Sequence, residues 1–544
     1  MPHPPEVLER IRRIIAFHDT TKLASNGSAS VEAQPSHFLT YPQFERTPCP
    51  TNLLDAPTSS LQVLANGISA LPDSLIHPPQ TLKTLATWLQ LAAGMTRKII
   101  VADHSLFLLA CPSAGASYPC ELYVLNLGIK DVRPGLYHFS TRHFSLYRLR
   151  DGWESLAQLK RGRPDLDMLK AMPAIILVST LIHRSTWKYG PRGYRYATID
   201  AGHVIENLVH AGTGLGIQMM VRLHLNDRNT RELIGVTPNI PYDQYEAVQG
   251  FVAWADLAVN PIPVPAVRPA PATLAPIARA SPAAGVADQP AIRGVHDDCI
   301  APGVGVNEVR PPHTDRCPLI RGARHESISR EPVTCDTSVF QALQKRHSTH
   351  TFDPHGISRD HFAALNRLTF RGGTYHPLMP GGAHMGLLRP FWFVHNVTGL
   401  APGVWYYHAN HDEFTAVRSA DLRFDAKYLF DQQYCGDASA ICIMIADLAN
   451  AMHCSGPDAY RLAHLEAGVA GARLYIACTA LDLQCCAAGS FNDIELAQSL
   501  DLTGSDWQCI YAFAVGGHHR PNQSTASTQL TPAAESNYDG PELK

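Results

Sequence analysis

A lysine and a tyrosine stand side by side at Lys188-Tyr189, inside a segment that the chain contains twice. An amine and a phenol can both transfer a proton when their surroundings shift their pKa values toward neutrality. The second copy of the segment has Cys454-Ser455 at the same place. The loss of both groups from one copy makes the pair a candidate for proton transfer and indicates one active site per chain.

The two copies of this segment, residues 187–208 and 453–474, align without a gap at an offset of 266 residues. They share turn-forming and small residues, a Tyr-Arg pair and an acidic position. The shared pairs are Gly190/Gly456, Pro191/Pro457, Tyr194/Tyr460, Arg195/Arg461, Ala197/Ala463, Asp200/Glu466, Ala201/Ala467, Gly202/Gly468 and Leu208/Leu474. We interpret the shared residues as serving the fold, because they persist in the copy that lacks the Lys-Tyr pair.

Matching elements on both sides of the segment extend the repeat. Segments rich in β-branched and aromatic residues precede it, as strands require, while long apolar helices and a closing strand follow it. The matched strands are 121–126 with 389–396 and 247–254 with 509–517, and the turn PGLY at 134–137 matches PGVW at 402–405. The pattern predicts an α+β fold in each copy, with helices packed against a mostly antiparallel sheet.

A chain of 544 residues suits two domains of roughly 200 residues each plus connections. We expect a first domain over 1–257, which carries the Lys-Tyr pair, and a second over 331–520. The intervening 258–330 begins with a run rich in Pro and Ala, which predicts a stiff linker. The tail 521–544 has a composition typical of disorder.

Composition and charge exclude several classes of protein. A formal net charge of −3 provides no basic field for nucleic acid or an anionic membrane. No apolar run approaches the ~20 residues that span a bilayer, and the start lacks the apolar core of a signal peptide, so we expect a cytoplasmic protein. The 13 cysteines form no repeated CxxC and the 27 histidines no HExxH, so we predict buried reduced thiols and no metal.

Taken together in their order, several motifs resemble the nitroreductase superfamily, in its SagB-type branch of azoline-oxidising flavin dehydrogenases. The motifs are FHDTTK (17–22), PSAGASYPCELYV (112–124), PGLYHF (134–139), WKYGPRGYRYATIDAGH (187–203), RHSTHTF (346–352) and CIYAFAVGG (509–517). The resemblance covers most of 17–255 and 335–520. It implies two nitroreductase-like domains packed as an intramolecular pseudo-dimer, in place of the two identical subunits that bind FMN at their interface in that superfamily.

The resemblance also implies a composite cofactor site. In the superfamily, an Arg-x-Ser-x-Arg/Lys segment and the C-terminal strand of one subunit hold the FMN phosphate and ribityl chain, while a Pro-Ser loop of the other lies against the ring. The loop corresponds here to Pro112, Ser113, Ala114 and Gly115 of the first copy, and the phosphate side to Arg346, His347, Ser348, His350 and Arg520 of the second. The second copy also has Gly489 and Ser490 where the family places a Gly-Phe near the flavin. The first copy has no Arg-x-Ser pattern around 45–55, and the second has Pro380-Gly381-Gly382-Ala383 as its loop, which implies one FMN per chain.

The chemistry of these residue types fits those roles. An arginine fork with a neighbouring hydroxyl suits a phosphate dianion, although His350 replaces the usual cation, a loss that Arg520 could offset. A Ser-Ala-Gly loop leaves backbone N–H groups free to approach a flat ring. For Lys188-Tyr189 the resemblance implies removal of a substrate proton while flavin N5 takes a hydride. Arg192 and Arg195 are nearby cations that could lower the pKa of the pair.

The predicted function is an FMN-dependent dehydrogenase that oxidises a peptide-derived or natural-product intermediate, from azoline to azole. Its expected partner is a peptide or small-molecule substrate, free or bound to a carrier or complex, with no nucleic acid or membrane. One alternative is an NAD(P)H-dependent nitro- or quinone reductase of the same fold. Another is a degenerate scaffold for a peptide-modifying complex. Substrate identity stays open, because specificity lies in loops without a recognisable code.

Overall fold

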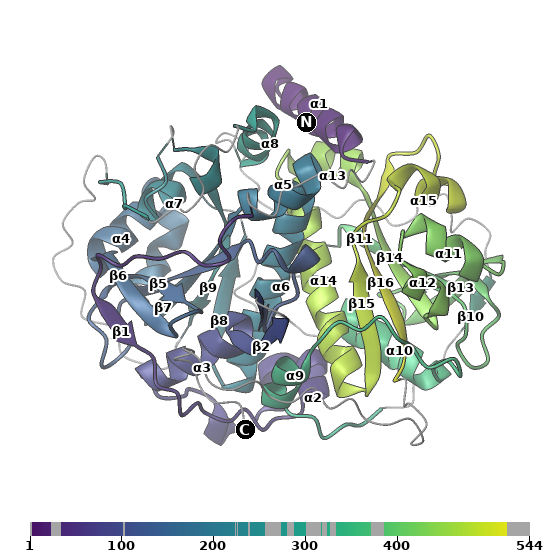
Figure 1. Cartoon of the computed structure of the whole chain (residues 1–544), viewed down its shortest axis with the longest axis horizontal. Helices are drawn as coiled ribbons and strands as arrows, with labels where there is room; N and C mark the ends of the chain where they lie inside the picture. Colours follow the sequence, from purple (N-terminus) through teal and green to yellow (C-terminus); the bar gives the residue numbers. More distant parts are fainter. Residues whose placement is uncertain are drawn as a thin grey trace.

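Two seven-stranded antiparallel sheets flank a central pair of long helices in the computed structural model (Figure 1). The structure describes residues 3–22, 34–101, 104–223, 225, 227–237, 240–255, 274–279, 288–300, 317, 324–326, 333–371 and 386–518. The predicted α+β fold with two tandem domains is confirmed. We call the parts built around the two sheets the first and the second repeat.

The two sheets have the same topology. The first has the order β1-β6-β5-β4-β7-β9-β8 and the second β10-β13-β12-β11-β14-β16-β15, with equivalent strands in equivalent places. The first consists of β1 (Arg46–Pro48), β4 (Cys120–Asn126), β5 (Gly135–Ser140), β6 (Ser145–Asp151), β7 (Ala174–Leu181), β8 (Met219–Arg222) and β9 (Glu246–Trp254). The second consists of β10 (Arg324–Glu326), β11 (Leu388–Val394), β12 (Gly403–His408), β13 (Glu413–Ser419), β14 (Ala440–Asp447), β15 (Leu483–Ala488) and β16 (Trp507–Gly517). A separate hairpin pairs β2 (Met95–Val101) with β3 (His104–Leu109).

Helices α6 (Gly193–Gly214) and α14 (Ala459–Ala480) lie against each other between the sheets (Figure 1). The remaining α-helices are α1 (Pro5–Thr20), α2 (Ser60–Asn66), α3 (Leu82–Ala93), α4 (Gly152–Leu159), α5 (His183–Tyr189), α7 (Asp227–Leu233), α8 (Pro290–Ile300), α9 (Val339–Lys345), α10 (Arg359–Asn366), α11 (Arg423–Leu429), α12 (Gln433–Asp437), α13 (Leu448–Ser455) and α15 (Asp493–Ser499). Short 3-10 turns cover Gly67–Ala70, Asp73–Leu75, Ala114–Ala116, Pro164–Ala171, Gly190–Arg192 and Tyr242–Gln244, and a π turn covers Arg367–Arg371. Among the described residues, none of the helices has the length and apolar character that a bilayer crossing requires.

The two repeats pack on each other as a pseudo-dimer. One buried apolar cluster runs through both, with Trp88 and Ile205 of the first repeat and Trp392 and Leu474 of the second among its members. The aligned glycines of the repeated segment meet where α6 and α14 cross. A Cβ on Gly202 would lie 2.2 Å from the carbonyl oxygen of Leu465 and 2.8 Å from the Cα of Gly468. These glycines are shared because the helix backbones touch there.

We expect Gly202→Ala to lower the free energy of unfolding of the whole chain by about 1–3 kcal/mol, because the new methyl group must push two backbones apart. The matched control is Gly294→Ala in α8, where a Cβ would meet no atom within 4 Å. An alanine in open helical space should leave stability unchanged or raise it by about 0.4–1 kcal/mol. Denaturant unfolding of both variants measures the difference, and equal effects would contradict a close helix crossing.

Helix α8 lies inside the segment predicted as a linker and corresponds to α1. His18 Nδ1 of α1 lies 3.2 Å from Tyr460 Oη, and His296 Nδ1 of α8 lies 3.1 Å from Tyr194 Oη. Because Tyr194 and Tyr460 are aligned residues, the two helices occupy equivalent places on opposite repeats. Residues 258–330 therefore include elements of the second repeat, namely α8 and also β10, which pairs with β13. The predicted tail 521–544 lies outside the described residues.

Candidate active site

The loop that joins β3 to β4 is held tightly onto helix α6. Gly115 has a φ of +58°, in the left-handed region that favours glycine. Ser113 Oγ donates a hydrogen bond to Asp200 Oδ2 at 2.6 Å, and the Tyr118 backbone N–H donates to Ser113 Oγ at 2.9 Å. The hydroxyl of Ser113, a predicted cofactor-binding residue, therefore fixes the loop. Pro112 is buried behind it, whereas Gly115 is exposed at its tip.

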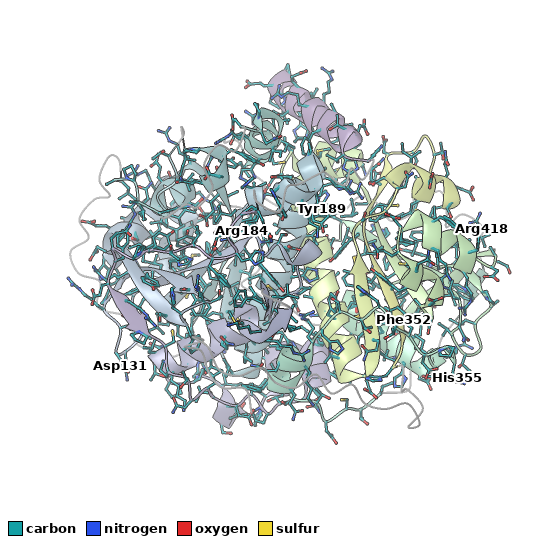
Figure 2. All side chains as sticks on the ribbon, viewed as in Figure 1. Asp131, Arg184, Tyr189, Phe352, His355 and Arg418 are labelled. Atoms are coloured by element: carbon teal, nitrogen blue, oxygen red, sulfur yellow. The ribbon has the colours of Figure 1, made fainter. Side chains whose placement is uncertain are left out.

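Lys188 and Tyr189 end helix α5 directly over the tip of this loop. A Cβ built on Gly115 would lie 2.2 Å from Tyr189 Oη and 2.6 Å from Lys188 Nζ. Lys188 Nζ lies 5.4 Å from the centre of the Tyr189 ring. Figure 2 labels Tyr189 where the two repeats meet. The structure thus brings the predicted proton-transfer pair and the predicted ring-facing loop to one place.

Arg346 reaches the same place from the second repeat. It follows α9, and its Nε and Nη2 donate to the carbonyl oxygens of Ala110 and Leu109, at 2.9 and 3.3 Å, at the start of the loop. Its guanidinium carbon lies 5.2 Å from the centre of the Tyr475 ring. Nη1 is buried and has no hydrogen-bond partner among the described residues. A buried cationic donor left unsatisfied suits an anionic group such as the FMN phosphate.

The other residues predicted on the phosphate side differ in how they lie. Ser348 Oγ is 2.8 Å from Tyr475 Oη, beside Arg346. The exposed His350 ring stacks on Tyr434 with 4.7 Å between ring centres. His347 turns away, since its Nδ1 lies 2.9 Å from the Lys345 carbonyl oxygen. Arg520 and the loop Pro380-Gly381-Gly382-Ala383 lie outside the described residues.

Gly489, which follows β15, is connected to the Lys-Tyr pair through Tyr196. Tyr196 Oη donates to the Gly489 carbonyl oxygen at 2.8 Å, and its ring lies edge-on to Tyr189 at 4.9 Å. Ser490 is the next, half-buried residue. Tyr196 was not among the predicted site residues. The alignment of the two copies contains the difference that indicates it, because Leu462 of the second copy aligns with Tyr196.

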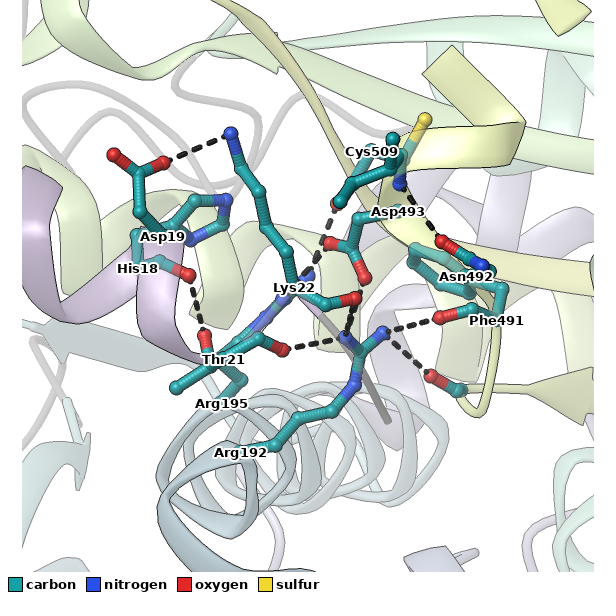
Figure 3. A network of polar contacts seen from close by, with 12 residues as sticks. His18, Asp19, Thr21, Lys22, Arg192, Arg195, Phe491, Asn492, Asp493 and Cys509 are labelled. Atoms are coloured by element: carbon teal, nitrogen blue, oxygen red, sulfur yellow. Dashed lines mark hydrogen bonds and ion pairs between the residues drawn. The ribbon is translucent and has the colours of Figure 1, made fainter. Parts of the chain in front are cut away.

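The expectation that Arg192 and Arg195 lower the pKa of the pair is wrong for Tyr189. Both arginines bind the buried Asp493 carboxylate of the second repeat, Arg195 at 2.9 Å (Figure 3). Burial raises the pKa of Tyr189 well above its usual value, with smaller contributions from Tyr196 and Asp200. Tyr189 therefore keeps its proton near neutral pH and is able to donate a hydrogen bond.

The pseudo-symmetric counterpart of Arg346 is a glycine. The backbones of Ser59 and Ser338, which precede α2 and α9, form a bridge with each other, so these two helices are equivalent. Arg346 follows α9 as Gly67 follows α2, and Ser348 corresponds to Ser69. Residues 45–55, which the sequence suggests as the equivalent of the Arg346 segment, contain β1 instead. The first repeat therefore has no arginine at the position equivalent to Arg346. That position is Gly67, and it lies outside residues 45–55.

A buried carboxyl group on the central helix holds the corresponding loop in both repeats. Asp200 accepts from Ser113 and from the Ala114 N–H, and Glu466 accepts from the backbone N–H groups of Gly386 and Leu387 at 3.1 and 3.0 Å. Burial raises the pKa of each group to about 7. Their presence in both repeats indicates a role in holding the loops.

These raised pKa values predict that stability falls as pH rises. The unfolded chain releases both protons near pH 4, whereas the folded chain keeps them to about pH 7. Between these values each carboxyl lowers the free energy of unfolding by about 1.4 kcal/mol per pH unit. Asp200→Asn and Glu466→Gln cannot ionise and should each flatten the profile in denaturant unfolding between pH 5 and 8. If the free energy of unfolding of the variants changes with pH as steeply as that of the wild type, the raised pKa values of Asp200 and Glu466 are contradicted.

The family model named Nitroreductase family matches the chain twice, over residues 78–253 and 343–517. The chain belongs to the nitroreductase family. It is 32% identical over 162 residues to MJ1384 of Methanocaldococcus jannaschii, a protein named as a nitroreductase, in a match over 29% of this chain and 76% of that protein. A crystal structure described as a nitroreductase of Anabaena variabilis ATCC 29413 superposes with a TM-score of 0.72 at 23% identity, over 93% of this chain and 99% of that one.

A second relative has a name that refers to the processing of trifolitoxin. The trifolitoxin-processing protein TfxB of Rhizobium leguminosarum bv. trifolii is 29% identical over 135 residues. The match spans 24% of this chain and about a third of TfxB, 36% of its length. The family matches show that the chain contains two nitroreductase domains.

Proposed function

We propose that this nitroreductase-family chain is a cytoplasmic FMN-dependent dehydrogenase that oxidises an azoline ring to an azole in a peptide-derived or natural-product intermediate. The observation that carries the proposal is the convergence of Lys188 and Tyr189 on Gly115, in the only repeat that keeps both groups. The similarity to TfxB, a protein named for trifolitoxin processing, supports a natural-product intermediate as the substrate. The unsatisfied Nη1 of Arg346 supports binding of the FMN phosphate beside the same loop.

The cofactor and the residues around it have separate roles in this reaction. FMN, when bound, supplies a hydride acceptor at N5. Arg346 and Ser348 would hold its phosphate, and the Pro112–Gly115 loop would contact its ring. Within the pair, Tyr189 retains its proton and orients the substrate by donating a hydrogen bond, so acceptance of the substrate's Cα proton falls to Lys188 Nζ.

The test uses the full chain reconstituted with FMN and an azoline-containing peptide. Conversion to the azole removes two hydrogens, which mass spectrometry detects, and bleaches the flavin absorbance under anaerobic conditions. We expect both signals with the peptide and neither with NADPH. Bleaching by NADPH without peptide oxidation would support the reductase function instead. A colourless protein that binds no flavin would support the scaffold.

A further inference from the structure

We infer that Tyr196 is a positioning residue that joins the two half-sites of the active site. Held by Arg192, it fixes the Tyr189 ring of the first repeat against the turn at Gly489 of the second. The inference rests on the proposed function, because Tyr189 has its role in the reaction there.

The comparison of the two repeats separates this role from the fold. Position 196 aligns with Leu462, and Arg192 aligns with Asp458. Helix α14, with leucine at that position, has the same length as α6 and packs against it along the same interface. The fold of a repeat therefore does not require a tyrosine there. Tyr196 and Arg192 are absent from the repeat that also lacks the Lys-Tyr pair.

The contacts of Tyr196 reach both half-sites at once. Its hydroxyl accepts from Arg192 Nε at 2.7 Å and donates to the Gly489 carbonyl oxygen at 2.8 Å. Its ring faces Tyr189 edge-on, and a Cβ on Gly489 would touch the same ring at 3.1 Å. The side chain is 5% exposed, so water does not compete for these bonds. A shift of Tyr196 must therefore move Tyr189, Gly489 or both.

Arg192, which donates to Tyr196, is itself held by contacts with other segments of the chain (Figure 3). Its Nη1 donates to the Thr21 carbonyl oxygen at 2.7 Å and pairs with Asp493, and its Nη2 donates to the Gly489 and Phe491 carbonyl oxygens at 3.2 Å each. The guanidinium is buried, and charge-assisted bonds of this kind are stronger than neutral ones. The end of α1, helix α6 and the turn before α15 are thus tied together.

The equivalent contacts around Leu223, the residue aligned with Gly489, differ from those of Arg192 and Tyr196. Arg461 pairs with Asp458 on its own helix and donates directly to the Leu223 carbonyl oxygen at 2.6 Å. Leu462 occupies the position of Tyr196 in that half, and Ser455 occupies the position of Tyr189. The connection through an aromatic ring belongs to the site that has the Lys-Tyr pair.

The test compares Tyr196→Phe and Tyr196→Leu with Tyr194→Phe. The control removes a buried hydroxyl from the same helix, one bonded to His296 instead. Hydrogen exchange of residues 183–189 and 489–492, measured without substrate, should accelerate in both segments together for the Tyr196 variants and in neither for the control. Turnover of the FMN-bound Tyr196→Phe protein should fall about 10- to 100-fold with KM nearly unchanged, since a displacement of about 1 Å at a reacting group has effects of this size.

Unchanged exchange, acceleration of one segment alone, or wild-type turnover in Tyr196→Leu would overturn the inference. Loss of bound FMN from Tyr196→Phe would also overturn it, by making Tyr196 a cofactor ligand. If the wild-type chain oxidises no azoline peptide, the proposed function fails, and the exchange experiment still decides whether Tyr196 joins the half-sites.

Discussion

Replacing Lys188-Tyr189 by Cys-Ser, the pair found in the second repeat, should abolish most substrate oxidation and leave FMN bound. We expect turnover to fall by roughly 10²- to 10⁴-fold, the usual worth of a positioned proton-transfer group. FMN should stay bound because we propose that Arg346 and Ser348 of the other repeat hold its phosphate. Steady-state rates with the azoline peptide and the flavin absorbance of the purified variant measure the two effects.

The reciprocal change is the matched control. Cys454→Lys with Ser455→Tyr recreates the pair in the second repeat, where Gly67 stands in place of the arginine. It should neither add activity to the wild type nor restore activity to the first double variant. A first double variant that loses FMN would make the pair a structural feature, and one that keeps full activity would remove it from the mechanism.

Arg346→Ala should weaken FMN binding by about 2–5 kcal/mol, the usual cost of removing one partner of a buried, hydrogen-bonded charge pair. That cost corresponds to a loss of roughly 30-fold or more in affinity. The side chain presents a buried Nη1 that has no partner in the described part of the chain, and a bound phosphate would supply one. Titration of the flavin-free protein with FMN, followed by flavin fluorescence, measures the loss.

Lys345→Ala is the control, because it removes an exposed cation one residue away. It should change the affinity little. The same titration gives the stoichiometry, which we expect to be one FMN per chain because only one pair of half-sites has both the loop and the arginine. A ratio near two, or equal losses in both variants, would contradict the composite site.

The sequence by itself determined the duplication, the fold class and the asymmetry between the repeats. Each of these is a local property: strand and helix composition follows from the residues of one segment, and Lys188-Tyr189 against Cys454-Ser455 is visible from alignment alone. The same comparison contains Tyr196 against Leu462, but without coordinates nothing distinguishes that difference from ordinary divergence in a helix.

Only the tertiary structure decided which groups face one another and how they ionise. Arg192 and Arg195 are close to Tyr189 in the sequence, yet they bind Asp493 of the other repeat, and burial then raises the pKa of Tyr189. The Pro- and Ala-rich composition near its start predicts a linker over 258–330, but α8 forms within it. A helix of this length is marginal alone and gains its stability from packing, as where His296 contacts Tyr194. Contacts between residues hundreds of positions apart depend on how the helices cross. The residues of a single segment do not determine that packing.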